Sequence, residues 1–275
     1  ADRLELDPID LRMRNALDTT VPTSTGQVLH ASVPFKKMLG MAKDEVKSIR
    51  PLLEQAPKGK WRGVGVGCST RSIGSIRTPS RSSAVVSLNP DGSATVVCGH
   101  NDIGQGSDTM MAQVAAMELG VEVDRVQVVT NDTAITPDCE STSASRVTYL
   151  SGNAVRLAAA KARLQVLELA GRDLDCKPEE LKLMNGVVGH REQGRTLAEL
   201  FKKHTLHTVT AVADFMPETT PLDPETGQGS PAGTYSFSVH VALVELDKGT
   251  GEVRVLRYLA LCDVGRVINP LVVEG

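Results

Sequence analysis

Residues 84–120 read AVVSLNPDGSATVVCGHNDIGQGSDTMMAQVAAMELG and contain two kinds of secondary structure in succession. The runs at 84–88 and 94–98 are rich in β-branched residues and flank a Pro-Asp-Gly turn, which predicts a β-hairpin. The run from 107 to 119 reads as a helix, and Gly120 ends it. A hairpin followed by a helix is typical of α+β proteins and not of strict strand–helix alternation.

The same mixture continues on both sides of this stretch. We therefore predict an α+β fold with two lobes of mixed or antiparallel sheet and layered helices. We place a first lobe at residues 1–190 and a second lobe, ending in a long hairpin, at 191–275. The other expected helices start at Pro8, run from Ser32 or Val33 to a break at Pro51, and run from 145 to 170 with a stop at Gly171. Further β-hairpins are expected at Asn185-Gly186 and between 235–246 and 252–263. Residues 217–233 are expected to form a surface loop.

Composition limits the function classes. The 275 residues are 41% hydrophobic and 23% charged, which is enough to bury a substantial core. The net charge is -3, so no basic field favours nucleic acid or anionic lipid. Aromatic residues make up only 3%, which argues against base-stacking surfaces. No apolar run is long enough for a membrane span, and nothing resembles a signal peptide.

The cysteines are few and scattered. The chain has 5 of them, none in a C-x-x-C pair. That spacing matches neither a disulfide framework nor a zinc or iron–sulfur motif. Reduced thiols in a cytoplasmic protein are the simplest interpretation.

The first candidate site lies between the hairpin and its following helix. Gly104 and Gly106 let the backbone approach a ligand, and the N–H groups from Ser107 to Met110 are expected to form an anion site. The amide of Gln105 can both donate and accept hydrogen bonds. A glycine-rich turn with a serine cap explains the same residues without any ligand.

The second candidate site precedes the long helix. Ser141, Thr142, Ser143 and Ser145 crowd its start, although capping needs only one hydroxyl. The others suggest phosphate oxygens as the ligand. Glu140 is a candidate general base, but a loop carboxylate before a run of serines is more often a helix cap or a solvated charge. Two such helix starts in one domain favour a phosphorylated cofactor.

Other chemistries fit the sequence less well. A G-x-S-x-G elbow is absent, so a serine nucleophile for acyl transfer is disfavoured. His100 follows a strand and is most simply a hydrogen-bonded structural residue. No set of histidines has the spacing of metal ligands, so we expect no direct metal ligand.

Four motifs then occur in order along the chain, and together they resemble the large molybdenum-binding subunit of the xanthine dehydrogenase/aldehyde oxidase family. Residues 7–15, DPIDLRMRN, resemble the family's D-P-x-x-x-R-x-R-N. Residues 103–109 resemble M-G-Q-G-x-x-T, with Ile103 in place of Met. Residues 141–155, STSASRVTYLSGNAV, resemble G-T-S-A-S-R-x-T-x-x-x-G-N-A-V. Residues 244–270 are similar to V-E-V-D…T-G-x-V…D-x-G…I-N-P.

The resemblance implies a molybdenum ion held by molybdopterin or by molybdopterin cytosine dinucleotide. In the family, the two loops contact the pterin and its phosphates. The matching residues are Gly104, Gln105, Gly106, Ser141, Thr142, Ser143, Ala144 and Ser145.

The resemblance also implies an oxidoreductase acting on aldehydes, N-heterocycles or related aromatic substrates. Iron–sulfur clusters, and possibly FAD, would lie on other domains or subunits. The family's catalytic glutamate is expected beyond Gly275, so this chain looks like an internal fragment, inactive by itself, that pairs with the remaining parts of the molybdenum subunit. The alternative is a non-catalytic phosphate-binding, nucleotide-binding or protein-interaction module with the same fold.

Overall fold

A computed structural model describes residues 1–30, 32–75, 80–190 and 193–275. It divides into two compact units, one formed by residues 1–77 and 219–266 and the other by residues 78–218 and 267–275. The sequence placed the division between 190 and 191 instead. The structure differs because strand pairing joins distant segments: a strand at 209–215 belongs to the sheet that contains 82–88, and a strand at 60–72 pairs with 235–247.

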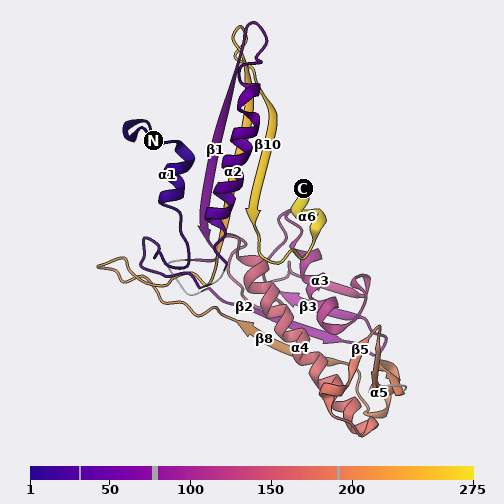
Figure 1. The fold of residues 1–275 in the computed structure, drawn as a ribbon. Helices are drawn as coiled ribbons and strands as arrows, with labels where there is room; N and C mark the ends of the chain where they lie inside the picture. The colour runs from indigo at the N-terminus through magenta and orange to yellow at the C-terminus, as the bar shows by residue number, and fades with distance from the viewer. Residues whose placement is uncertain (31, 76–79, 191–192) are drawn as a thin grey trace. The chain divides into compact units, whose positions relative to one another are not determined.

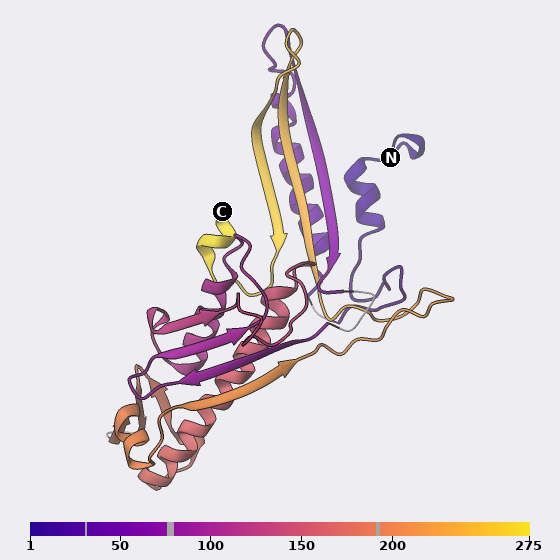
Figure 2. The same ribbon diagram turned by 180° about the vertical axis from the view of Figure 1, so that it is seen from behind.

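The first unit is a three-stranded antiparallel sheet with helices on one face. Its strands are β1 (Lys60–Ser72), β9 (Tyr235–Asp247) and β10 (Val253–Asp263), in the order β1-β9-β10. The expected pairing of the two last strands is confirmed. The helix α2 (Phe35–Ile49) runs along this sheet (Figures 1 and 2), and α1 (Pro8–Arg14) packs beside α2. Pro51 lies in a short 3-10 turn, Arg50–Leu52, that follows α2.

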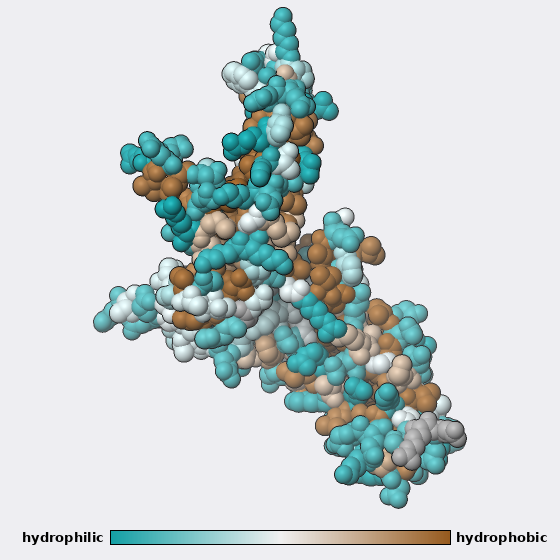
Figure 3. All heavy atoms as spheres, in the orientation of Figure 1, coloured by the Kyte–Doolittle hydropathy of each residue, from teal (hydrophilic) through white to brown (hydrophobic). Residues whose placement is uncertain are grey.

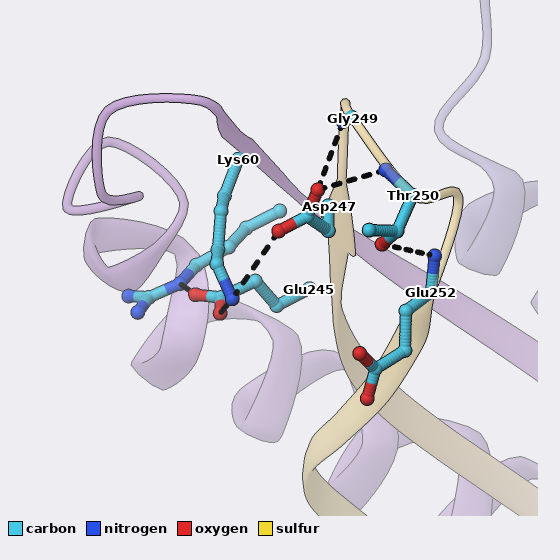
Figure 4. A network of polar contacts seen from close by, with 7 residues as sticks. Lys60, Glu245, Asp247, Gly249, Thr250 and Glu252 are labelled. Carbon is cyan, nitrogen blue, oxygen red and sulfur yellow. Dashed lines mark hydrogen bonds and ion pairs between the residues drawn. The ribbon is translucent and has the colours of Figure 1, made fainter.

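Glu245 and Asp247, the two acidic residues at the start of the last motif, have structural roles at the turn between β9 and β10. Figure 4 shows the Asp247 carboxylate accepting hydrogen bonds from the backbone N–H groups of Gly249 (2.8 Å) and Thr250 (3.1 Å). Glu245 is buried and accepts from Arg62 at 2.9 Å, with Lys60 at 3.3 Å. The hydrogen bond from Arg62 lowers the pKa of the Glu245 carboxyl. In this unit the motif therefore fixes the hairpin.

The second unit contains a four-stranded mixed sheet. Its order is β4-β3-β2-β8, with β3 and β4 parallel and the other pairs antiparallel. A small antiparallel sheet, β5-β6-β7, follows the long helix. The element bounds in this unit are β2 (Ser82–Leu88), β3 (Ala94–Cys98), α3 (Ser107–Leu119), β4 (Val126–Val129), α4 (Arg146–Leu174), β5 (Lys182–Met184), β6 (Val187–His190), β7 (Gln193–Thr196), α5 (Leu197–Lys203), β8 (Val209–Phe215) and α6 (Pro270–Glu274), with 3-10 turns at Val123–Arg125 and Pro178–Glu180. A further 3-10 turn, Asp2–Leu4, lies in the first unit.

The core of this unit lies between the four-stranded sheet and the pair α3 and α4. Alternate residues of β2, β3 and β8 are buried, and these residues pack with the small side chains of α4. Helix α4 runs three residues past Gly171, where the sequence placed its end. A Cβ at Gly171 would lie 2.7 Å from the Cys176 carbonyl oxygen, so the glycine allows a close approach and does not terminate the helix.

The short helix α6 shows why the last motif contains Asn-Pro. Asn269 caps the helix by accepting from the Val272 N–H at 3.3 Å, and Pro270 occupies its first position. Hydrophobic spheres lie over α6 in Figure 3, and Leu271 is 80% exposed. Among the described residues, no helix has both the length and the apolar character needed to cross a membrane. All five cysteines are free thiols, as expected.

Candidate functional site

The loop from Gly99 to Gly106 joins the end of β3 to the start of α3. Gly104 and Gly106 both have left-handed backbone conformations, with φ of 103° and 77°. Such values favour glycine, which explains why both positions carry it. The Gln105 side chain lies against its own loop: its Oε1 accepts from the Ile103 N–H at 2.7 Å, and its Nε2 donates to the Ser107 hydroxyl at 2.9 Å.

The expectation of a free anion site at Ser107–Met110 is wrong, because the Asp102 carboxylate lies at this helix start. This carboxylate accepts from the N–H groups of Gly104 (2.8 Å) and Asp108 (3.1 Å), and the Met110 N–H bonds to Gly106. The backbone N–H of Gly104, followed by that of Asp108, lowers the pKa of the Asp102 carboxyl. Helix α3 therefore already holds a negative charge at its N-terminus. The signal was an Asp two residues before a loop glycine, which is an Asx-turn pattern.

The loop before α4 offers a different environment. Ala144 and Ser145 have φ of 51° and 54°, and α4 has no acidic residue in its first turn. The hydroxyls of Ser141 and Ser143 lie 3.0 Å apart, and both residues are exposed. No side chain caps the start of α4, whereas the Asp102 carboxylate accepts from an N–H group at the start of α3, so this loop fits a phosphate better than the α3 loop does.

Glu140 is held by an ion pair with Arg146 at the start of α4. The Arg146 side chain is only 5% exposed, and its Nε has no partner among the described residues. A buried guanidinium requires a compensating charge. Glu140 therefore neutralises Arg146, a role that the sequence did not predict.

The two loops meet. The Thr142 hydroxyl donates to the Asn101 carbonyl at 2.9 Å and accepts from the Asn101 N–H at 3.0 Å. The Nε2 of Gln105 also lies 3.4 Å from that carbonyl. At the base of the loops, a Cβ on Gly99 would lie 3.1 Å from the Cys139 backbone nitrogen. The structure thus brings the two candidate loops together, and α3 and α4 pack against each other behind them.

The chemistry of this loop pair suits a cofactor with phosphates. The eight candidate residues offer hydroxyls, one amide and backbone N–H groups, and none carries an imidazole, thiolate or carboxylate. Such donors bind polar ligand atoms by hydrogen bonds and do not coordinate a metal directly. Ser82, Ser151 and His100, which are buried beneath the loops, form a separate polar group. The expectation that His100 is hydrogen-bonded is confirmed, since its Nδ1 bonds to Ser151.

Known proteins resemble the whole chain. The carbon monoxide dehydrogenase large chain of Hydrogenophaga pseudoflava is 33% identical over 70% of this chain and 24% of that protein. The 6-hydroxypseudooxynicotine dehydrogenase complex subunit gamma of Paenarthrobacter nicotinovorans is 29% identical over 98% of this chain. The chain spans 35% of that relative's length.

Solved structures agree. Quinoline 2-oxidoreductase from Pseudomonas putida 86 matches 100% of this chain and 36% of its own, with a TM-score of 0.81 and 27% identity. The aldehyde oxidoreductase from Desulfovibrio gigas matches 99% of this chain and 28% of its own, with a TM-score of 0.82 and 25% identity. The model of the molybdopterin cofactor-binding domain matches residues 41–275. That match includes both loops, the whole second unit and the first unit from residue 41 on, and this chain therefore belongs to the molybdopterin cofactor-binding domain family.

Proposed function

We propose that this chain forms part of the molybdopterin pocket of an oxidoreductase of the molybdenum hydroxylase type. The observation that carries the proposal is the junction of the two loops through Asn101 and Thr142. One phosphorylated ligand has to contact both loops, and this junction holds them next to each other. The cofactor, when bound, supplies the two-electron redox chemistry.

The residues of the chain would have distinct tasks. Ser141, Ser143 and Ser145, with the N–H groups at the start of α4, would bind phosphate oxygens. The exposed Gln105 would donate and accept hydrogen bonds at the edge of the pterin. The remaining members of the set shape the loops: Gly104, Gly106 and Ala144 through their left-handed backbones, and Thr142 through its bonds to the neighbouring loop.

The whole protein would oxidise aldehydes, N-heterocycles or related aromatic substrates, the chemistry that its relatives' names describe for quinoline and aldehydes. We assign no catalytic residue within 1–275 and propose that the general base comes from another part of the protein. The partners would be the remaining parts of the molybdenum subunit and subunits carrying iron–sulfur clusters and possibly FAD. We place the protein in the cytoplasm. The comparisons give no support to a non-catalytic module.

Thr148→Glu tests the phosphate role of α4. Thr148 is exposed in the first turn of α4 and has no side-chain hydrogen bond among the described contacts. A carboxylate there suits the helix dipole, so folding should not suffer. It should repel a phosphate, because two unit charges about 5 Å apart interact by about 3 kcal/mol at an effective dielectric constant of about 20. That energy corresponds to roughly 100-fold in affinity.

The measurement is the molybdenum and pterin content of the protein purified with its partner subunits. The matched control is Lys37→Glu, an exposed first-turn position in α2, which should leave both contents unchanged. If Thr148→Glu retains its full pterin content, α4 does not bind the cofactor phosphate and the proposal fails.

A further inference from the structure

Three potential metal ligands converge beneath the two loops. Cys98 ends β3, His100 lies two residues later, and Cys139 comes from the loop before α4. Their exposed fractions are 0%, 0% and 1%. One ligand atom from each lies within 4.8 Å of the other two. Sequence spacing does not reveal this group, since 40 residues separate the second cysteine from the first.

The sulfur atoms have the separation that a shared metal requires. The Sγ atoms of Cys98 and Cys139 lie 3.9 Å apart. Two thiolates bound tetrahedrally at about 2.3 Å from a zinc ion are about 3.8 Å apart. The Ser82 hydroxyl lies 3.2 Å from the Cys139 sulfur and 3.9 Å from the Cys98 sulfur.

His100 is oriented in the way typical of a metal-bound histidine. Its Nδ1 forms a hydrogen bond with Ser151, whose hydroxyl also lies 2.9 Å from Ser82. Its Nε2 is buried and has no partner in the described part of the chain. In metal sites, one ring nitrogen usually binds such an outer partner while the other binds the metal. A buried nitrogen without a hydrogen-bond partner otherwise destabilises the fold.

Donors also surround the Cys139 sulfur. The Ser82 hydroxyl donates to it at 3.2 Å, and the Gly99 N–H donates at 3.4 Å. The Cys139 Sγ also lies 3.3 Å from the Ser83 carbonyl oxygen, to which the thiol donates, and binding a metal would release this proton. Thiolate and imidazole together select soft or borderline ions such as Zn²⁺ over Mg²⁺ or Ca²⁺.

We propose that Cys98, His100 and Cys139 bind one Zn²⁺ ion, which ties together the bases of the two loops at the candidate cofactor site. All three ligands are buried, so the ion would be shielded from solvent, and a fourth ligand such as a water molecule would complete its tetrahedron. The alternative to a metal site is a disulfide between Cys98 and Cys139. It would leave the His100 Nε2 without a partner, and this favours the metal.

The test uses the complete purified protein, kept reduced and stripped with a chelator. Zinc is then titrated against a chromophoric chelator. Cobalt substitution gives an independent reading, because sulfur-to-cobalt charge-transfer absorption measures how many thiolates bind. We expect one Zn²⁺ per chain, and cobalt absorption of the intensity given by two thiolates.

Variants assign the ligands. Cys98→Ser and Cys139→Ser should each weaken zinc binding by at least about 100-fold, since the loss of an outer partner alone typically costs 10- to 100-fold. Ser151→Ala should show that smaller loss. Cys176→Ser, a half-buried cysteine elsewhere in the same unit, should bind zinc like the unchanged protein.

The unchanged protein decides the question even if the variants fail to fold. An absence of thiolate–cobalt absorption in folded protein refutes the site, as does a 98–139 disulfide in protein purified under reducing conditions. If Cys176→Ser loses as much zinc affinity as Cys98→Ser and Cys139→Ser do, the assignment of the two cysteine ligands is refuted. Molybdenum is measured in the same samples: zinc without molybdenum would contradict the proposed function alone, and molybdenum without zinc would contradict the zinc site alone.

Discussion

Gly99→Ala is the substitution that most directly tests how the two loops are held together. An added Cβ would lie 3.1 Å from the Cys139 nitrogen and 3.2 Å from the Pro137 carbonyl carbon, and closer still to the Pro137 carbonyl oxygen. All three atoms belong to backbone, so no side-chain rotation relieves the contact. The loop at Pro137 must retreat by about 1 Å to restore normal separations.

The expected loss of stability has two parts. Overpacking in a well-packed region costs about 1–3 kcal/mol. The retreat also strains the two hydrogen bonds between Asn101 and Thr142, each worth about 0.5–1.5 kcal/mol. A loss of about 2–4 kcal/mol in the free energy of unfolding follows. For a unit of this size, that lowers the melting temperature by about 4–16 °C.

The assay is urea and thermal unfolding of Gly99→Ala beside Gly152→Ala. Gly152 lies in α4 of the same unit, and a Cβ there would make an ordinary 3.5 Å contact with the Met110 sulfur. Since alanine favours helix over glycine, Gly152→Ala should be neutral or up to about 1 kcal/mol more stable. If Gly99→Ala is as stable as Gly152→Ala, the loops do not approach each other as described, and the junction loses its role.

Two further changes test the loops separately. Asp102→Ala should lower the free energy of unfolding by about 0.5–2 kcal/mol at pH 7, as the loss of a helix cap does. Because the folded-state pKa of Asp102 is lowered, this contribution is present above about pH 4 and is lost as the pH falls further. The urea midpoints of the variant and the unchanged protein should therefore converge at low pH. Ala144→Gly should raise the free energy of unfolding by up to about 1 kcal/mol, since a left-handed alanine costs about 1–2 kcal/mol and part of that gain is offset by the greater chain entropy of glycine in the unfolded state. Ala144→Val should lower the free energy of unfolding. If urea unfolding gives the opposite order of stability, the left-handed backbone at residue 144 is contradicted.

Local patterns predicted the elements well. The hairpin of β2 and β3, the helix from Ser107, and the pairing of β9 with β10 all follow from short-range signals, because turn residues and periodicity act within a few positions. The sequence did not predict how the chain divides into two units. This division depends on which distant strands pair, and β8 and β1 carry no mark in the sequence that names their partners.

The candidate site shows the same limit at the scale of single residues. The glycines and serines of the two loops were identifiable from the sequence, because their residue types are unusual for helix starts. The role of each backbone group was not predictable: the Asp102 carboxylate lies at the N-terminus of α3, whereas no side chain caps α4, and the proposed anion site is therefore at α4. A helix start predicts free N–H groups, but a carboxylate within a few residues can take them first.

The sequence predicted that the two loops share one phosphorylated cofactor, but it did not predict which residues join them. Asn101 and Thr142 are 41 positions apart and contact each other through one hydroxyl. Thr142 was among the predicted site residues as a possible phosphate ligand, whereas Asn101 was not, since exposed Asn is common in loops. Their contact depends on α3 and α4 packing side by side, which brings both helix starts to the same end of the unit. A cofactor pocket built in this way is sensitive to helix packing: substitutions far from the loops that separate α3 from α4 should reduce cofactor content before they unfold the unit.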